Sequence, residues 1–269
     1  MAKMGWVVMM SVNWHKKKKV KLEGFTLIEL MIAMMLGLIV IGGALSIYIS
    51  TIKSSSDVVK SARLNYDLDS VMQLMVNDIR RAGFTGIPSG GLDTLNNAFM
   101  ATATTLNIRT LAGAAADPGE CILYSYDSNS DSVVDNAEYY GFKLDGGAVW
   151  VRYSGSNTTS CADGNWERIT HQNKVSITAL QFSFSPIGNL TATSRCLNYL
   201  IEPDPITNLP NPVTDAIDCT DPAPVSGDYI AQKRVINIVL SGIVNGDNAV
   251  LKSLSTTVEV RNHRLYKVL

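Results

Sequence analysis

Twelve residues, DSNSDSVVDNAE (127–138), space their oxygen-bearing side chains as a calcium-binding loop does. In the pattern D-x-[DN]-x-[DN]-G-x5-E, alternate positions wrap several hard oxygen ligands around one Ca²⁺ ion. Ser132 stands where that pattern has glycine, and clusters of Asp, Asn and Ser also form ordinary solvated turns. Two interpretations stay open, a solvated turn and a Ca²⁺ site, whose ligands would be Asp127, Asn129, Asp131, the carbonyl of Val133, Asp135 and Glu138.

The chain contains four cysteines, Cys121, Cys161, Cys196 and Cys219. An even number of cysteines in an oxidising compartment favours disulfides. Of the three connectivities we prefer Cys121–Cys161 with Cys196–Cys219, because each bond closes a local loop. A zinc site is the alternative, but no C-x-x-C pair and no nearby histidine supports it.

No catalytic constellation is visible. The three histidines, His15, His171 and His263, are far apart in the sequence. The chain has no nucleophile motif, P-loop or dinucleotide fingerprint. We therefore expect that the protein is not an enzyme and has no catalytic residues.

A single carboxylate, Glu29, lies within the apolar stretch GFTLIELMIAMMLGLIVIGGALSIYI (24–49). From Phe25 to Ile49 it is the only charged side chain, and about 20 apolar residues suffice for a helix to cross a membrane. A carboxylate in such a helix costs roughly 2.5–3.5 kcal/mol on insertion scales. We therefore expect Glu29 to have a functional partner.

The order Gly24-Phe25-Thr26-Leu27-Ile28-Glu29, followed by the apolar run, resembles the processing site of the type IV pilin superfamily. The resemblance implies that a prepilin peptidase cleaves after Gly24. It also implies that the new terminus at Phe25 is N-methylated and that Glu29 becomes the fifth residue of the mature chain. An ordinary signal anchor with a chance glutamate is the alternative.

Cleavage at this site would create an ammonium group at Phe25, which is itself costly in lipid. When helices pack in a filament, Glu29 of one subunit could neutralise the ammonium of another. The attraction is strong where the dielectric constant is low, but both ions also carry a desolvation penalty. We interpret Glu29 as a device that sets the register of the subunits more than as a source of net stability.

The helical pattern continues beyond the apolar run. Apolar residues recur at spacings of three and four up to Ala82, and Gly83 and Pro88 then end the helix. One helix of roughly 85 Å over residues 25–82 is predicted. The apolar face consists of Leu64, Leu68, Val71, Met72, Met75, Ile79 and Ala82. Three glycines in the apolar half allow either close packing or local unwinding, and both outcomes stay open: Gly37, Gly42 and Gly43.

From about residue 100 the period changes to two, which is typical of strands. Asp145-Gly146-Gly147 predicts a hairpin turn. Residues 186–230 hold seven prolines, so we expect a long surface excursion without central strands, closed by Cys196–Cys219. The predicted strands are 104–109, 121–126, 139–144, 148–153, 175–185, 234–243 and 254–261.

These patterns predict an α+β fold, in which a long N-terminal transmembrane and amphipathic helix packs on a mainly antiparallel β-sheet head domain, as in pilins. The predicted divisions are a prepilin leader (1–24), a transmembrane or filament-core helix (25–49), its amphipathic continuation (50–86) and a β-rich periplasmic head domain (87–269).

Charge predicts the orientation in the membrane. The first 24 residues hold six lysines and one glutamate, and their removal leaves 17 basic and 23 acidic residues (23 − 6 and 24 − 1), a net charge near −6. An acidic mature chain gives no support to direct nucleic-acid binding. Because lysines before a span stay in the cytoplasm, we expect a single-pass inner-membrane protein with its C-terminal domain in the periplasm.

The stretch DIRRAGFTG (78–86) resembles PilW-type minor pilins, with support from CILYSYD (121–127) and YGFKLDGGAV (140–149). The resemblance implies a minor pilin that helps to initiate type IV pilus assembly, is incorporated into the pilus and supports twitching motility and adhesion. Its expected partners are the prepilin peptidase, other minor pilins and the major pilin. The alternatives are a J-type pseudopilin of type II secretion and a pilus-associated adhesin that binds through residues 186–230.

Overall fold

A computed structural model describes residues 24–86, 97–171, 173–199, 201–203, 210–212, 217–218 and 226–268. The chain divides into two compact units, residues 1–54 and 55–269. The predicted leader lies outside the described residues except for Gly24, which precedes the first helix in a segment without regular secondary structure.

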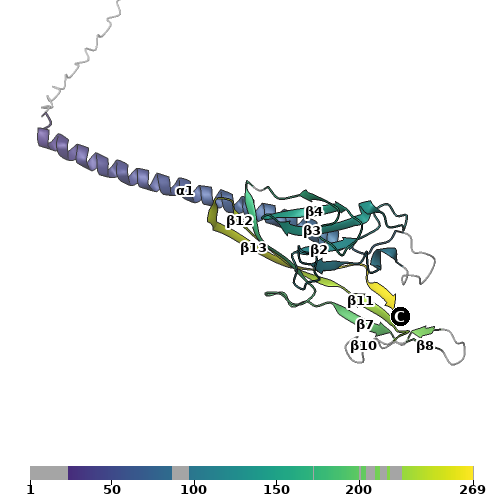
Figure 1. Cartoon of the computed structure of the whole chain (residues 1–269). Coiled ribbons are helices and arrows are strands. Elements are labelled where there is room, and N and C mark those ends of the chain that lie inside the picture. The colour runs from purple at the N-terminus through teal and green to yellow at the C-terminus, as the bar shows by residue number, and fades with distance from the viewer. Residues whose placement is uncertain are drawn as a thin grey trace, which may run out of the picture. The chain divides into compact units, whose positions relative to one another are not determined.

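One long helix, α1 (Leu27–Ile79), is the main element of the N-terminal part (Figure 1). It runs without interruption through all three glycines of the apolar half, so no local unwinding occurs there. The helix begins two residues later and ends three residues earlier than predicted. After Ile79, the amides of Arg81 and Ala82 donate to carbonyls three residues back, which tightens the last turn.

Gly83 terminates this turn. Its φ of 74° lies in the left-handed region that glycine adopts without a steric penalty, as is common after a helix. A Cβ atom at this position would lie 2.6 Å from Cε of Met100, so the Met100 side chain would have to shift, and the positive φ is the stronger reason for glycine. Gly83 N–H donates to the carbonyl of Ser125 at 2.8 Å, which attaches the end of the helix to a strand.

The second unit has its core on the predicted apolar face of α1. All seven predicted residues of that face are buried, and Leu68, Met75 and Ile79 have no exposed surface. They form one cluster with apolar residues from the neighbouring strands, among them Phe142 and Leu180. The amphipathic continuation of the helix is confirmed as a core element.

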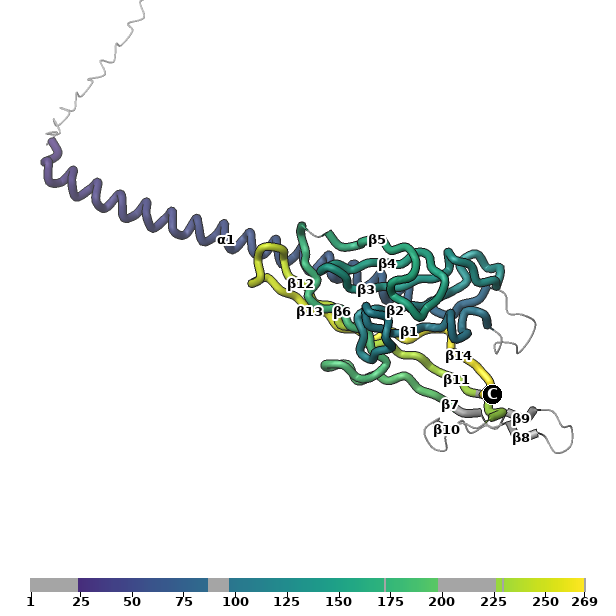
Figure 2. The backbone as a smooth tube through the Cα atoms, viewed as in Figure 1, coloured from purple at the N-terminus to yellow at the C-terminus, as the bar shows by residue number. Residues whose placement is uncertain are grey.

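A five-stranded antiparallel sheet lies on this helix, with its strands in chain order (Figure 2). Gly146 and Gly147 both have positive φ, 57° and 71°, and form the predicted two-residue hairpin turn. A short 3₁₀ turn, η3 (Asn136–Glu138), precedes the third strand. The strands are β1 (Asn107–Arg109), β2 (Cys121–Ser125), β3 (Tyr139–Asp145), β4 (Ala148–Ser154) and β5 (Asn165–Arg168).

A second antiparallel sheet has the order β13-β12-β6. The burial of β6 alternates along much of its length, as expected for a strand with one face on the core. Its strands are β6 (Val175–Ser183), β12 (Val235–Val244) and β13 (Asp247–Glu259). A 3₁₀ turn, η2 (Ala98–Met100), places Phe99 and Met100 in buried positions before β1.

A third sheet contradicts the prediction that residues 186–230 form an excursion without central strands. Its order is β10-β7-β11-β14, so β7 and β11 are central. Neither strand contains proline, and three prolines lie instead in a separate two-stranded ribbon of edge strands. The third-sheet strands are β7 (Arg195–Tyr199), β10 (Ile217–Asp218), β11 (Tyr229–Lys233) and β14 (Arg264–Lys267), and the ribbon strands are β8 (Ile201–Pro203) and β9 (Pro210–Pro212). The α+β fold of a long helix and antiparallel sheets is confirmed.

Candidate functional site

The predicted processing segment lies immediately before α1. Gly24, Phe25 and Thr26 are not helical and are exposed, so the Gly24–Phe25 bond is accessible. The Thr26 hydroxyl accepts a hydrogen bond from Glu29 N–H at 3.2 Å, and Thr26 C=O accepts from Leu30 N–H at 3.1 Å. Thr26 therefore caps the helix. The cap fixes where the helix starts relative to the predicted cleavage site.

The apolar half of α1 is exposed at every position except Gly37, which is half-buried. An 18-residue window of the helix has a mean hydropathy of 2.5 and none of it is buried in the structure. A core helix of a soluble protein would be mostly covered, whereas this stretch exposes large side chains such as Leu27 (80%), Leu38 (70%) and Ile47 (71%). Length, composition and exposure together fit a helix whose surroundings are lipid or other helices.

Glu29 is an exposed carboxylate in the first turn of this apolar helix. Residues 25 and 29 are one helical turn apart in sequence, so the ammonium formed by cleavage and the carboxylate would lie at the same end of the helix. A neighbouring helix that is shifted along its axis by about one turn could bring its ammonium to this carboxylate.

Polar side chains of the DIRRAGFTG stretch (78–86) connect the end of α1 to the five-stranded sheet. Asp78 accepts hydrogen bonds from the hydroxyls of Tyr124 (2.6 Å) and Tyr126 (2.9 Å). The Arg81 guanidinium lies 4.0 Å from the centre of the Tyr126 ring and 3.8 Å from Asp78. Burial and the Asp78 charge both raise the pKa values of the two tyrosines, which stay protonated and donate. Tyr140 stacks on Tyr126 with ring centres 4.0 Å apart.

The predicted calcium loop is held mainly by hydrogen bonds to backbone amides. Both oxygens of the buried Asp127 accept from N–H groups, Oδ1 from Ser130 (2.6 Å) and Oδ2 from Gly86 (2.8 Å) and Ser132 (3.0 Å). Burial alone would raise the pKa of Asp127, but these amides outweigh it and lower the pKa. Ser132 adopts a positive φ of 61°, which is the conformation that the glycine of the template supplies.

Glu138, the predicted last ligand, is also buried and also accepts from amides, Ser128 N–H at 2.8 Å and Asp135 N–H at 3.2 Å. With Asp135, which accepts from Ala137 N–H, it forms the capping box of η3. Among the described residues, no group of three or more Asp, Glu, His or Cys side chains is arranged to hold a metal ion. Ca²⁺ would have to compete with these amides for the carboxylate oxygens, and Ca²⁺ binding by this loop stays a prediction.

The disulfide prediction is confirmed for Cys121–Cys161, with an S–S distance of 2.10 Å. Cys196 is also disulfide-bonded. Its predicted partner, Cys219, lies outside the described residues. The first bond attaches the loop between β4 and β5 to the buried strand β2.

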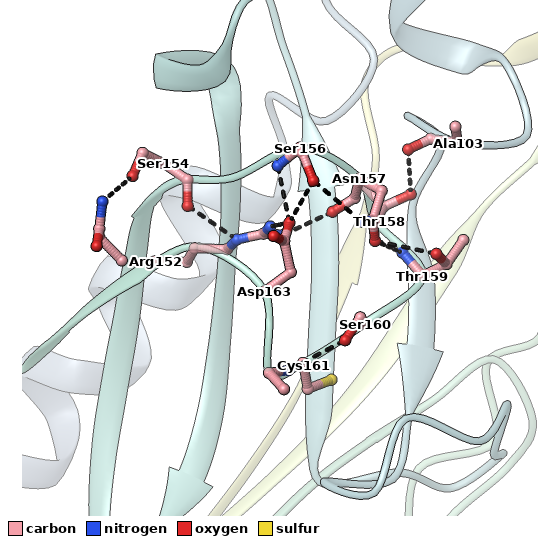
Figure 3. Close-up of polar contacts among 12 residues, drawn as sticks. Ala103, Arg152, Ser154, Ser156, Asn157, Thr158, Thr159, Ser160, Cys161 and Asp163 are labelled. Atoms are coloured by element: carbon pink, nitrogen blue, oxygen red, sulfur yellow. Dashed lines mark hydrogen bonds and ion pairs between the residues drawn. The ribbon is translucent and has the colours of Figure 1, made fainter.

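A buried arginine organises the same β4–β5 loop, as Figure 3 shows. The Arg152 side chain is completely buried, pairs with Asp163 and donates to the carbonyls of Ser154 (3.0 Å) and Asn157 (2.8 Å). Asp163 also accepts from the amide and the hydroxyl of Ser156, and these bonds, with the Arg152 charge, outweigh burial and lower the pKa of Asp163. A Cβ atom at Gly155 would collide with the guanidinium, so the loop fits closely around it.

Sequence reasoning missed Arg152, Asp163 and the role of Asp78. The helical period correctly places Asp78 near the end of α1, but its tyrosine partners are 46 and 48 residues away. Arg152 is in strand β4, and an arginine is normally solvated. The aspartate that pairs with it, Asp163, precedes a glycine in the Cys161-Ala162-Asp163-Gly164 turn and offers no distinguishing pattern.

The fold and the N-terminal segment together define a type IV pilin-like protein, with a long membrane-length helix that continues into an α+β head domain. A family model described as "Prokaryotic N-terminal methylation motif" matches residues 23–45, which include Gly24, Phe25 and Glu29. This match supports processing by a prepilin peptidase.

A second family model, described as "Prepilin peptidase-dependent protein B", matches residues 57–260, more than half of the chain. The chain therefore belongs to the prepilin peptidase-dependent protein B family. No match was found to a curated protein or to a solved structure. The pilin-like class agrees with the prediction from the sequence, and its members are structural proteins.

Proposed function

We propose that this protein is a minor pilin that takes part in initiating type IV pilus assembly. It is inserted in the inner membrane with its head domain in the periplasm, cleaved after Gly24 and N-methylated at Phe25. The subunits then leave the membrane by packing their α1 helices together. In this role it resembles PilW-type minor pilins and supports twitching motility and adhesion through the pilus.

The observation that carries this proposal is the continuity of α1. One helix begins at the processing segment and exposes an apolar surface over about its first half. Its second half contributes buried apolar side chains to the core of the second unit. Apolar side chains that leave lipid must be covered, and each fully buried Leu, Ile or Met side chain contributes about 1.5–3 kcal/mol. Other helices of the same kind would provide that cover.

Glu29 gives the assembly its register. In a bundle of apolar helices a lone carboxylate is unfavourable, so the packing in which it meets the ammonium of a neighbouring Phe25 is selected over others. Removing the carboxylate leaves insertion intact, because an uncharged side chain is less costly in lipid. It also leaves the neighbouring ammonium without a partner.

The test compares cells of the native host that express Glu29→Ala, Glu29→Gln or, as a matched control in the same part of the helix, Met31→Leu. The three variants should reach the membrane in equal amounts. Glu29→Ala and Glu29→Gln should be reduced in sheared surface filaments, whereas Met31→Leu should be incorporated as the wild type is. Normal incorporation of both Glu29 variants would refute the role of the carboxylate.

Deletion of the gene distinguishes the two alternative functions. Loss of surface pili with normal export of a type II secretion substrate supports the minor pilin. Loss of export with normal pili would indicate a J-type pseudopilin, whose fold would be similar. Normal pili, normal export and reduced adhesion would indicate a binding module, for which residues 186–230 are the candidate surface.

A further inference from the structure

Two arginines line one cavity of about 340 Å³ in the head domain, and neither pairs with a carboxylate among the described residues. The cavity lies where β1, β11 and β14 approach one another, strands that Figure 2 shows near each other. Its other polar lining consists of hydroxyl and amide groups. The polar residues that line it are Thr105, Asn107, Ser194, Gln232, Arg234 and Arg264.

Arg234 is the more buried of the two, with 4% of its surface exposed. Its Nη1 donates to the Thr105 hydroxyl at 3.0 Å and its Nη2 to the Asn262 carbonyl at 3.2 Å. Its Nε is buried and has no hydrogen-bond partner among the residues that the structure describes. Burial and the nearby charge of Arg264 lower the pKa of Arg234 to about 10, so the side chain is still a cation at neutral pH. A buried cation without an anion is costly.

Both arginines lie where the chain crosses between the second and third sheets. Arg234 is the single residue between β11 and β12, and Arg264 is the first residue of β14, shortly after β13 ends. The two crossings are joined by Val260 N–H, which donates to Arg234 C=O at 3.0 Å. Arg264 Nε donates to the Met100 carbonyl at 3.2 Å, which holds its guanidinium at the cavity.

We propose that this cavity is a binding site for a phosphate-type oxyanion, held by Arg234 and Arg264. Guanidinium groups bind phosphate and carboxylate through paired, charge-assisted hydrogen bonds. A phosphate group carries about −1.5 to −2 at pH 7, so one such group neutralises both arginines, whereas one carboxylate would leave a buried positive charge. The neighbouring hydroxyl and amide groups can donate to the remaining phosphate oxygens.

The bound anion would join the second and third sheets at their two crossings. It would thereby fix the orientation of the sheet that carries Cys196 relative to the sheets packed on α1. The shared chemistry is a phosphoryl group, and its source is either free phosphate or a phosphate monoester.

The full-length chain in detergent is titrated calorimetrically with inorganic phosphate, glycerol phosphate and acetate, at constant ionic strength in chloride. The wild type should bind inorganic phosphate at one site per chain, and acetate more weakly. Arg264→Gln should weaken phosphate binding by about tenfold or more, because it removes one guanidinium from the anion. Arg261→Gln, at an exposed arginine three residues earlier, is the matched control and should bind as the wild type does. Glycerol phosphate binding as tightly as phosphate would support a monoester as the source, and much weaker binding would support the free ion.

Thermal unfolding gives a second readout that does not depend on a ligand titration. Without phosphate, Arg264→Gln should raise Tm, because it removes the positive charge beside Arg234. With saturating phosphate, the same variant should have a lower Tm than the wild type. The proposal is overturned if phosphate fails to bind, if acetate binds as tightly, or if phosphate raises the Tm values of the wild type and Arg264→Gln equally.

Discussion

Replacing Asp78 by Ala should strongly destabilise the second unit, because this carboxylate is the acceptor for two tyrosine hydroxyls at the end of α1. Tyr124 is fully buried and Tyr126 is 4% exposed, and both donate to Asp78. Without it, two buried hydroxyls lose their acceptor. Each buried polar group left unsatisfied costs about 1–3 kcal/mol, so the expected loss in the free energy of unfolding is about 2–6 kcal/mol.

Two effects modify this magnitude. The Arg81 guanidinium loses the carboxylate 3.8 Å away but keeps its stacking on Tyr126. Alanine is a better helix former than aspartate by a few tenths of a kcal/mol, which offsets a small part of the loss. Asp78→Asn, which keeps one acceptor oxygen, should fall between the wild type and Asp78→Ala.

The assay is urea unfolding of the full-length chain in detergent, followed by the fluorescence of the head-domain tryptophans. Asp69→Ala is the matched control, since Asp69 is an exposed aspartate on the same helix. It should change the free energy of unfolding by less than about 0.5 kcal/mol. If Asp78→Ala is as stable as Asp69→Ala, the hydrogen bonds to Asp78 contribute nothing to the free energy of unfolding, and the reasoning is refuted.

Three further predictions concern the head domain. The Arg152–Asp163 pair should show a coupling energy of about 0.5–3 kcal/mol in a double-mutant cycle with Arg152→Met and Asp163→Asn, measured by urea unfolding; additive single effects would contradict it. The lowered pKa of Asp127 implies stability that is complete above its unfolded pKa of about 4 and is lost as pH falls through its lower folded pKa. Asp127→Asn should therefore be less stable than the wild type at pH 7 and approach it near pH 2, and parallel stability curves would exclude this linkage. In calorimetry of the full chain, Ca²⁺ should bind the wild type and not Asp131→Ala, and absence of heat for the wild type would leave a solvated turn as the interpretation.

Much of the fold could be predicted because its signals are local. The apolar run, the three- and four-residue spacing and the Gly83 stop are each contained within a few turns of helix, and α1 follows them to within three residues. The hairpin at Gly146-Gly147 is equally local. The processing segment could be predicted because a peptidase must recognise a short sequence, whatever the fold of the head domain.

The third sheet could not be predicted, because proline density is an average over the whole of residues 186–230. Prolines exclude only the positions that they occupy, and the proline-free segments 195–199 and 229–233 pair with each other as central strands. The polar sites depend on distant segments that come together: Asp78 accepts a hydrogen bond from Tyr124, and Arg234 and Arg264 line one cavity. Such pairs exist only after the sheets have packed.

The amino terminus of the protein in cells is the most direct test of prepilin processing and of the assembly role derived from it. Mass spectrometry of the chain extracted from membranes or sheared filaments measures it without any variant. The expected result is a chain that begins at Phe25 and carries one additional methyl group. A chain that still contains residues before Gly24, with an unmodified terminus, would contradict prepilin processing and the assembly role derived from it.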